Sequence, residues 1–229
     1  DESEIASIFV RAAEFKTKGF ASSRVLDRDP GNAPVVALAF FEASTRTRLS
    51  FDSAAQRLGC KTIGFDNPEL TSSAKGEQLE DTLRVIEQYS DAIVVRRKAH
   101  DTVDIIREHV SIPVISAGVG AHEHPTQGLL DAFTIQEHRS LESVKHVASY
   151  GDLINSRTMF SQVRLLARPG MTFSFISHEG MQINSEFIAE LEGRGVTVFT
   201  TSNLDEVIDE LDVLHVIRPQ RERWEGKEH

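Results

Sequence analysis

The feature that most constrains the fold is a regular alternation between short apolar or β-branched runs and segments with helical spacing. A short apolar run bounded by turn residues favours a buried strand, and alternation of such strands with helices favours parallel sheets. The runs fall into an earlier and a later series along the chain. The predicted strands are Val35–Phe41, Thr62–Phe65, Ala92–Val95, Pro113–Ala117, Val144–Tyr150, Met171–Ile176, Val196–Thr200 and Val213–Ile217. The sequence therefore predicts an α/β protein.

Helices are predicted between these strands from apolar residues at helical spacing and from helix-end signals. A helix that follows Thr45 would stop at Gly59, because glycine is typical of the position after a helix C-terminus. Pro125 is well placed in the first turn of another helix. The remaining predicted helices are Leu79–Ile86, Pro125–Glu137, Arg157–Ala167, Glu186–Glu192 and Leu204–Leu211.

The chain length favours two domains. A chain of 229 residues is long for one compact domain and sufficient for two. No Pro-, Gly- or Ser-rich linker separates the two series of strands, so a rigid element would have to join the domains, and the helix Pro125–Glu137 is the best candidate. We therefore expect two doubly wound parallel-sheet domains, residues 1–138 and 139–229, joined by this helix.

Composition excludes several classes of protein. The single cysteine, Cys60, excludes an intrachain disulfide framework and a multi-cysteine zinc site. The net charge of −10, from 25 basic and 35 acidic residues, argues against non-specific nucleic-acid binding, which depends on basic excess. No apolar run approaches the roughly 18 residues of a membrane-spanning helix, and the first residues lack the pattern of a signal peptide. We expect a cytoplasmic protein that binds neither nucleic acid nor membrane.

The most informative segment runs from Phe40 to Phe51 and reads FFEASTRTRLSF. It lies where a predicted strand passes into a helix, and the first N–H groups of a helix lack acceptors and carry partial positive charge. The hydroxyl groups of Ser44 and Thr45 and the guanidinium of Arg46 add donors, so the segment favours a phosphate site. Alone, a short S-T-R motif is more often a helix cap followed by a solvated basic face.

Polar residues also stand at the ends of other predicted elements. His124-Pro125-Thr126-Gln127 opens a helix; its histidine can donate to a carbonyl oxygen and its glutamine can contact an amide, although His-Pro alone is more often a structural turn. Arg96 ends a buried-looking strand, and open α/β sheets bind ligands at the carboxyl ends of their strands. Arg97 and Lys98 follow it, where they either strengthen the local attraction for anions or face solvent.

The second half of the chain carries residues suited to carboxylates. The segment Gly151–Thr158, which contains Arg157, follows a predicted strand and opens a helix. Arg218 and Gln220 follow the last predicted strand, within the sequence RPQRER. Guanidinium groups bind carboxylates through two parallel hydrogen bonds, so these residues favour a dicarboxylate ligand.

Taken together, these motifs resemble the aspartate and ornithine carbamoyltransferases. The Phe40–Phe51 segment is similar, almost letter for letter, to the carbamoyl-phosphate loop of that family, and His-Pro-Thr-Gln is its second signature. Lys75 resembles the lysine of a loop ending in Lys-Gly-Glu that reaches into the neighbouring subunit's site, with Ser72 or Ser73 as its partner serine. The Arg-x-Gln-x-Glu-Arg pattern resembles the branch that uses aspartate, and the Ser-Met-Gly loop expected of the ornithine branch is absent.

The resemblance implies transfer of the carbamoyl group from carbamoyl phosphate to L-aspartate in pyrimidine biosynthesis, giving N-carbamoyl-L-aspartate and phosphate. It assigns catalysis to Thr47, Arg96 and His124, which would meet the negative charge that develops on oxygen. The residues implied to bind carbamoyl phosphate are Ser44, Thr45, Arg46, Thr47, Arg96, His124 and Gln127. Those implied to bind aspartate are Lys75, Arg157, Arg218 and Gln220.

The resemblance further implies a homotrimer with active sites between chains, and leaves regulatory chains or fused pathway domains open. No metal or cofactor is expected: Glu123 replaces the third glycine of a dinucleotide fingerprint, a P-loop is absent, and His122 and His124 lack further ligands at metal-like spacing. The family continues for several tens of residues after the point matching His229, so we expect the second domain to be incomplete.

Two alternatives to the aspartate enzyme stay open. The first is an ornithine or another amino-acid carbamoyltransferase. The second is a non-catalytic homologue that acts as an assembly subunit, because Arg97-Lys98 stands where the family has His-Pro after the arginine.

Overall fold

The computed structural model describes residues 2–19, 30–67, 69, 71–99, 101–120 and 123–219. The chain divides into two compact units, residues 1–121 and 122–229. The helix Pro125–His138 (α5) lies within the second unit, where it packs along Arg157–Leu166 (α6). The boundary expected after residue 138 stays a prediction.

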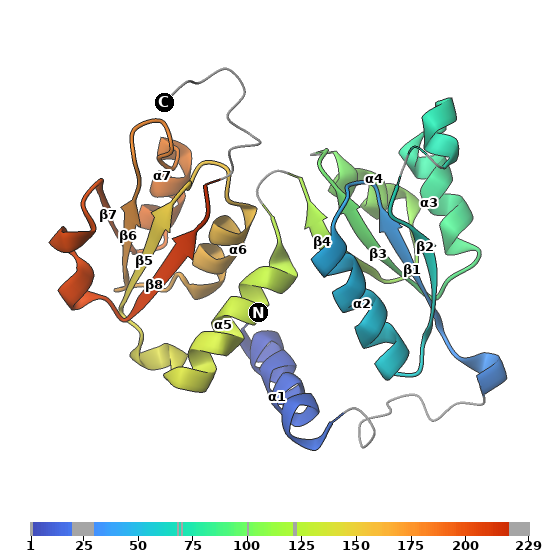
Figure 1. Ribbon diagram of the computed structural model, residues 1–229, viewed down its shortest axis with the longest axis horizontal. Helices are drawn as coiled ribbons and strands as arrows, with labels where there is room; N and C mark the ends of the chain where they lie inside the picture. Colours follow the sequence, from blue (N-terminus) through green and yellow to red (C-terminus); the bar gives the residue numbers. More distant parts are fainter. Residues whose placement is uncertain are drawn as a thin grey trace. The chain divides into compact units, whose positions relative to one another are not determined.

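The first unit is built on a four-stranded parallel sheet in the order β2-β1-β3-β4 (Figure 1). Its strands are Val35–Phe40 (β1), Lys61–Phe65 (β2), Ala92–Arg97 (β3) and Val114–Val119 (β4). Its helices are Glu2–Lys18 (α1), Thr45–Arg57 (α2), Leu79–Glu87 (α3) and Thr102–His109 (α4), with 3-10 turns at Pro30–Asn32 (η2) and Ser72–Lys75 (η4).

Both faces of this sheet are covered. On one face, Ala37, Leu83 and Ile93 belong to a buried cluster that includes residues from α3 and α4. On the other face, Leu38 and Phe40 pack with Phe51 of α2. Burial on both faces explains why the inner strands β1 and β3 are nearly continuous apolar runs, whereas the edge strand β2 has exposed residues.

The second unit repeats this plan with the strand order β7-β6-β5-β8, again all parallel. Its strands are His146–Gly151 (β5), Thr172–Ile176 (β6), Thr197–Thr201 (β7) and Val213–Ile217 (β8). Besides α5 and α6 it contains Ser185–Gly193 (α7) and the 3-10 turns Leu141–Ser143 (η5), Leu204–Glu206 (η6) and Ile208–Glu210 (η7).

Aromatic rings join its helices to one face of the sheet. The ring of Phe187 on α7 lies 4.7 Å from that of Phe160 on α6 and 6.3 Å from that of Phe175 on β6. The opposite face buries Ala148, Ile176 and Val207 beside the 3-10 turns. The predicted fold class, two doubly wound parallel-sheet domains, is therefore confirmed, and the predicted strands agree with the observed ones to within two residues at either end.

One predicted helix is wrong. Residues 204–211 form two short 3-10 turns instead of an α-helix. Asn203 accepts a hydrogen bond from the Asp205 N–H at 3.1 Å, which starts a tight turn. Asp209 and Glu210 place negative charge where a helix would end, and the helix dipole disfavours anions there.

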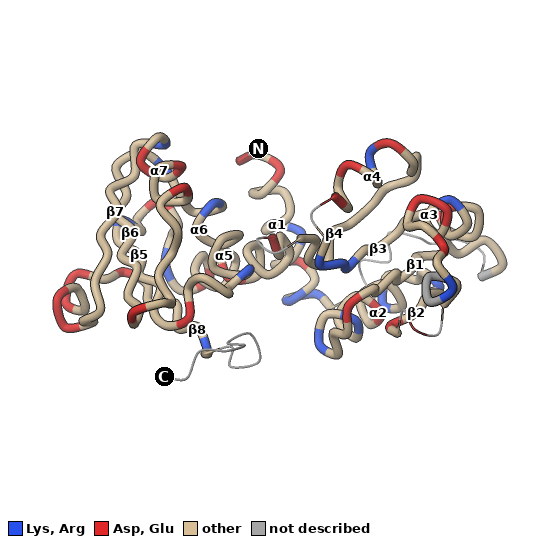
Figure 2. The backbone as a smooth tube through the Cα atoms, turned by 90° about the horizontal axis from the view of Figure 1, so that it is seen from above, with Lys and Arg blue, Asp and Glu red and all other residues tan. Residues whose placement is uncertain are grey.

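Acidic residues lie on several helices, and Figure 2 marks their positions in red along α3, α4 and α7. A basic stretch, in blue, marks the end of β3. Within the described ranges, no helix is both long and apolar enough to cross a membrane.

Candidate functional site

Strand order locates the candidate site in each unit. In the first unit the chain passes from β1 to β2 on one side and then crosses to β3 on the other side of β1. In the second unit it runs from β5 through β6 to β7 and then returns to β8, beside β5. Ligands of open α/β sheets bind at the carboxyl ends of the strands where the order reverses. The turns after β1 and β3, and those after β5 and β8, are therefore the candidate positions.

The turn between β1 and α2 presents unsatisfied donors. Ser44 is the residue before the helix, with extended backbone angles of φ −159 and ψ 93, and its side chain makes no capping hydrogen bond. The first N–H groups of α2 have no acceptor within the helix and lie at its positive end. Thr45 and Arg46 are exposed, whereas Ser44 and Thr47 are half-buried. A phosphate bound here would receive backbone, hydroxyl and guanidinium donors.

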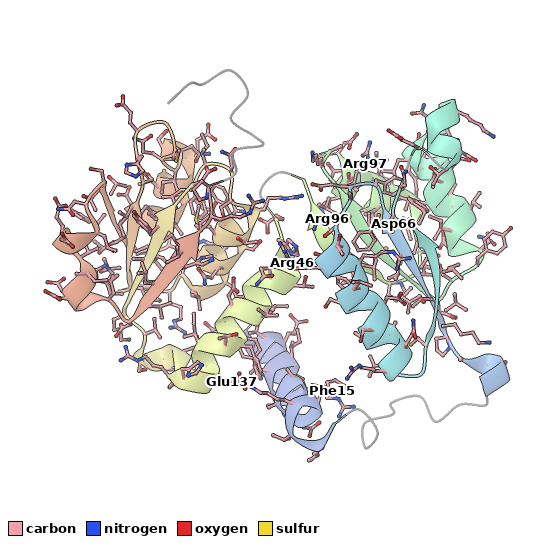
Figure 3. All side chains as sticks on the ribbon, viewed as in Figure 1. Phe15, Arg46, Asp66, Arg96, Arg97 and Glu137 are labelled. Carbon is pink, nitrogen blue, oxygen red and sulfur yellow. The ribbon has the colours of Figure 1, made fainter. Side chains whose placement is uncertain are left out.

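Arg96 lies at the same edge of the sheet, at the end of β3. It is 8% exposed and donates from Nη1 to the carbonyl oxygen of Ala117 at 3.0 Å. Its Nε lies 3.6 Å from Oε2 of Glu42, in the β1–α2 turn. The Phe41 N–H donates to the Arg96 carbonyl oxygen at 2.8 Å, which ties the two turns together. Figure 3 shows Arg46 and Arg96 at this edge.

A β-bulge provides the acceptor for Arg96. The register passes from Val95 opposite Ser116 to Arg97 opposite Val119, so β4 contains one extra residue at this point. Gly118 adopts a φ of +105 inside the bulge, a conformation that favours glycine. The extra residue leaves the Ala117 carbonyl available to the guanidinium of Arg96.

Arg97 has a different role from Arg96. Its Nη1 donates to Oδ1 of Asp101 at 2.7 Å and to Oγ1 of Thr102 at 3.0 Å, at the start of α4. Because its charge is paired with Asp101, Arg97 adds little to the attraction of an anion. Arg97 thus anchors the start of α4. Lys98 is exposed.

His124 and Gln127 lie at the start of α5, in the second unit. The backbone N–H of His124 donates to Oγ of Ser161 on α6 at 2.7 Å, and the Ser161 hydroxyl donates to Oε2 of Glu123 at 3.0 Å. Arg164 also binds Glu123 and is itself held by the Glu190 carboxylate. These contacts fix the turn that carries His124.

Gln127 is held separately by a side chain of its own helix. Its Nε2 donates to Oδ1 of Asp131 at 2.8 Å. Burial raises the pKa of Asp131, while the hydrogen bond from Gln127 and the attraction of His215 on β8 act in the opposite direction. Burial also lowers the pKa of His215.

Arg157 and Arg218 stand at the point where the strand order reverses in the second sheet. Arg157 begins α6 and is 7% exposed, behind Ser156, whose Oγ caps the helix by accepting from the Met159 N–H at 3.2 Å. Arg218 follows β8 and is exposed. A Cβ atom at Gly151 would lie 2.2 Å from the Ile217 carbonyl oxygen, so β5 and β8 are in close contact where these two turns begin.

The predicted site residues are divided between the two units. Ser44, Thr45, Arg46, Thr47 and Arg96 belong to the first unit, whereas His124, Gln127, Arg157 and Arg218 belong to the second. Lys75 is exposed at the end of η4. Gln220 lies outside the described residues.

The described residues contain no group of three or more His, Cys, Asp or Glu side chains arranged to hold a metal. The sequence analysis did not single out Ser161, Asp131 or His215. The spacing of four residues between Gln127 and Asp131 was a usable signal, since such pairs face each other on a helix.

Comparison with known proteins adds independent information. Residues 1–137 match a family model described as aspartate/ornithine carbamoyltransferase, carbamoyl-P binding domain. The aspartate carbamoyltransferase catalytic subunit of Halorubrum lacusprofundi is 44% identical over 198 residues, which cover 86% of this chain and 62% of that protein. The corresponding subunit of Methanocella arvoryzae is 41% identical over 222 residues, covering 96% and 70% respectively.

Solved structures give the same result. The catalytic subunit of M. jannaschii aspartate transcarbamoylase has a TM-score of 0.83 and 34% identity, covering 97% of this chain and 72% of that one. Aspartate transcarbamoylase from Trypanosoma cruzi in complex with carbamoyl phosphate has a TM-score of 0.84 and 31% identity, covering 97% and 70%. The chain thus spans about two thirds of the length of the relatives it matches.

Proposed function

The chain belongs to the aspartate/ornithine carbamoyltransferase family, and we propose that it transfers the carbamoyl group of carbamoyl phosphate to L-aspartate. The products would be N-carbamoyl-L-aspartate and phosphate, in pyrimidine biosynthesis and in the cytoplasm. The observation that carries the proposal is the joint position of the Ser44–Thr47 turn and Arg96 where the strand order of the first sheet reverses. Relatives named as aspartate carbamoyltransferases favour aspartate over ornithine as the acceptor.

In this proposal the start of α2 binds the phosphate. Ser44, Thr45 and Thr47 supply hydroxyl donors, and the helix supplies backbone N–H donors. Arg46 is exposed at the same turn and would add a charge-assisted fork to the phosphate oxygens. Gln127 would accept from the carbamoyl NH2 group and so orient it.

The chemical step is attack of the aspartate amine on the carbamoyl carbon, with phosphate as the leaving group. Negative charge develops on the carbamoyl oxygen, and donors that are already in place lower the energy of that state. Arg96 suits this role because the Ala117 carbonyl and Glu42 hold its guanidinium before any ligand binds. Thr47 and His124 would complete the set.

Aspartate would be bound by basic residues of the second unit and of a neighbouring chain. Arg157 and Arg218 flank the reversal point of the second sheet and would each receive a carboxylate, with Gln220 beside them. Lys75 would enter the site of an adjacent chain, which makes the proposed active unit a homotrimer. Regulatory chains or fused pathway domains are compatible with this arrangement.

The test compares two arginines of the same helix, Arg46 at its start and Arg57 at its end. In the intact protein, Arg46→Ala should lower carbamoyl-aspartate formation by at least about tenfold, because a charge-assisted hydrogen bond contributes roughly 1.5–3 kcal/mol. Arg57→Ala should leave it unchanged. Activity of Arg46→Ala within a factor of two of wild type would remove the phosphate assignment. Turnover with ornithine and not with aspartate would redirect the proposal to the other branch of the family.

A further inference from the structure

We propose that Asp131 is a positioning residue that fixes the side-chain amide of Gln127 and thereby selects a ligand carrying an NH2 group. The inference rests on the proposed function, in which Gln127 contacts the carbamoyl group. It adds the reason why the amide presents its oxygen, and not its nitrogen, to that ligand.

The geometry of α5 supports this role. Gln127 and Asp131 are four residues apart, so their side chains lie on the same face of the helix, and the hydrogen bond between them measures 2.8 Å. An ionised carboxylate can only accept hydrogen bonds. The Gln127 amide must therefore turn its NH2 group towards Asp131 and its oxygen away. Within the described residues, the side chain of Gln127 has this one hydrogen bond.

Without such a partner, a glutamine amide has no fixed orientation. Its oxygen and nitrogen ends are nearly equal in shape, and only the surrounding hydrogen bonds decide which end faces a ligand. If the amide turned over, its NH2 group would face the NH2 group of carbamoyl phosphate, and two donors would meet. The fixed oxygen instead accepts from that NH2 group.

The surroundings of Asp131 support a role for its carboxylate in holding Gln127. Its Oδ2 is buried without a hydrogen-bond partner among the described residues, and the same is true of Nδ1 of His215 on β8. Burying a carboxylate oxygen that has no hydrogen-bond partner costs free energy, and the attraction of the half-buried His215 offsets only part of that cost. The charge does not close an ion pair with Lys or Arg in the described part of the chain, and its hydrogen bond goes to Gln127.

Acetyl phosphate provides the discriminating ligand. It carries the same phosphate and carbonyl groups as carbamoyl phosphate but has a methyl group in place of NH2. The orientation of Gln127 therefore affects the binding of carbamoyl phosphate and not that of acetyl phosphate. A loss of general structure at the site would weaken both ligands together.

The experiment is isothermal titration of the intact protein with each ligand at pH 8. In wild type, carbamoyl phosphate should bind more tightly than acetyl phosphate. Asp131→Leu should weaken carbamoyl phosphate by about five- to tenfold, the range of a single hydrogen bond, and change acetyl phosphate by less than twofold. Asp131→Asn keeps an acceptor but adds a donor, so both amide orientations become available, and the ratio of the two affinities should fall by at least about twofold.

A control variant lies on the same helix. Thr134 is exposed, and its hydroxyl donates to the Leu130 carbonyl at 2.8 Å, so Thr134→Val removes a polar group of α5 and should leave the ratio unchanged. An unchanged ratio in Asp131→Leu and Asp131→Asn, or an equal loss for both ligands, would overturn the inference. If wild type binds neither ligand, the proposed function itself fails.

Discussion

The packing of α5 against α6 yields a prediction in which two known effects oppose each other. Gly128 lies inside α5 and is buried, and replacing glycine by alanine inside a helix normally stabilises a protein by about 1 kcal/mol. At this position, however, an added Cβ would lie 3.0 Å from the carbonyl carbon and oxygen of Ser161 and 3.2 Å from the N atom of Gln162. All three are backbone atoms of α6, which cannot move aside as a flexible side chain can.

The contact distances decide whether Gly128→Ala stabilises or destabilises the protein. Separations near 3.0 Å are well inside the 3.5–4.0 Å optimum for carbon atoms, so the helices must separate by several tenths of an ångström. Overpacking of this kind costs roughly 1–3 kcal/mol, which exceeds the gain in helix propensity. We expect Gly128→Ala to destabilise the protein by about 1 kcal/mol. At this chain length that lowers Tm by about 2–4 °C.

The change should also reach the candidate site, because Ser161 accepts from the His124 N–H at 2.7 Å. Pushing α6 away from α5 lengthens this hydrogen bond, so carbamoyl phosphate should bind more weakly.

The matched control is Gly193, the last residue of α7, where an added Cβ meets nothing within 4 Å. Scanning calorimetry of both variants should show a lower Tm for Gly128→Ala and an equal or slightly higher Tm for Gly193→Ala. If Gly128→Ala raises Tm as Gly193→Ala does, α5 and α6 separate freely, and the argument that their contact positions His124 is refuted.

Two further predictions concern acid stability and assembly. Arg164 donates to Glu190 through Nε and Nη2 and holds the pKa of that carboxyl below its ordinary value. A carboxyl whose pKa is lowered in the folded state stabilises the protein above its unfolded-state pKa of about 4.3, and this stabilisation is lost as the pH falls through the folded-state pKa. The Tm should therefore drop less between pH 6 and pH 3 in Glu190→Gln than in wild type. Equal drops in Tm would contradict this. Mixing Lys75→Ala chains with Arg46→Ala chains should give hybrids that form carbamoyl-aspartate faster than either variant alone, whereas hybrids that are no faster would argue against shared sites.

The inner strands of each sheet could be predicted from sequence because both of their faces are covered. Ala92–Val95 and Val35–Phe40 are buried or nearly buried along most of their length, so the apolar pattern alone marks them. The helix predicted at Leu204–Leu211 had the right apolar spacing, and Val207 is indeed buried against the sheet. Local turn chemistry at Asn203 and the acidic residues that follow outweighed this spacing in so short a segment.

The positions of the candidate residues in the fold could be predicted only where a strand end or a strand-to-helix junction fixes them locally. The Ser44–Thr47 turn follows directly from a strand-to-helix junction, and Arg96 from a strand end. The contact between His124 and Ser161 spans 37 residues and depends on how two helices pack, which no local pattern encodes. The pairing of Arg97 with Asp101 likewise could not be read from a local pattern, yet it decides whether the Arg97 charge is available to a ligand or stabilises the start of α4.

The two sheets place their arginines by a similar backbone device. In the first sheet, Gly118 has a φ of +105 and creates the bulge whose carbonyl group holds Arg96. In the second sheet, Gly151 has a φ of +123, and its missing Cβ lets the Ile217 carbonyl approach directly before Arg218. In both units, therefore, a glycine at the carboxyl edge fixes where a cationic side chain leaves the sheet. A side chain at Gly151 would displace the Ile217 carbonyl directly before Arg218, and one at Gly118 would strain the bulge whose Ala117 carbonyl accepts from Arg96, even though neither glycine offers a group to a ligand.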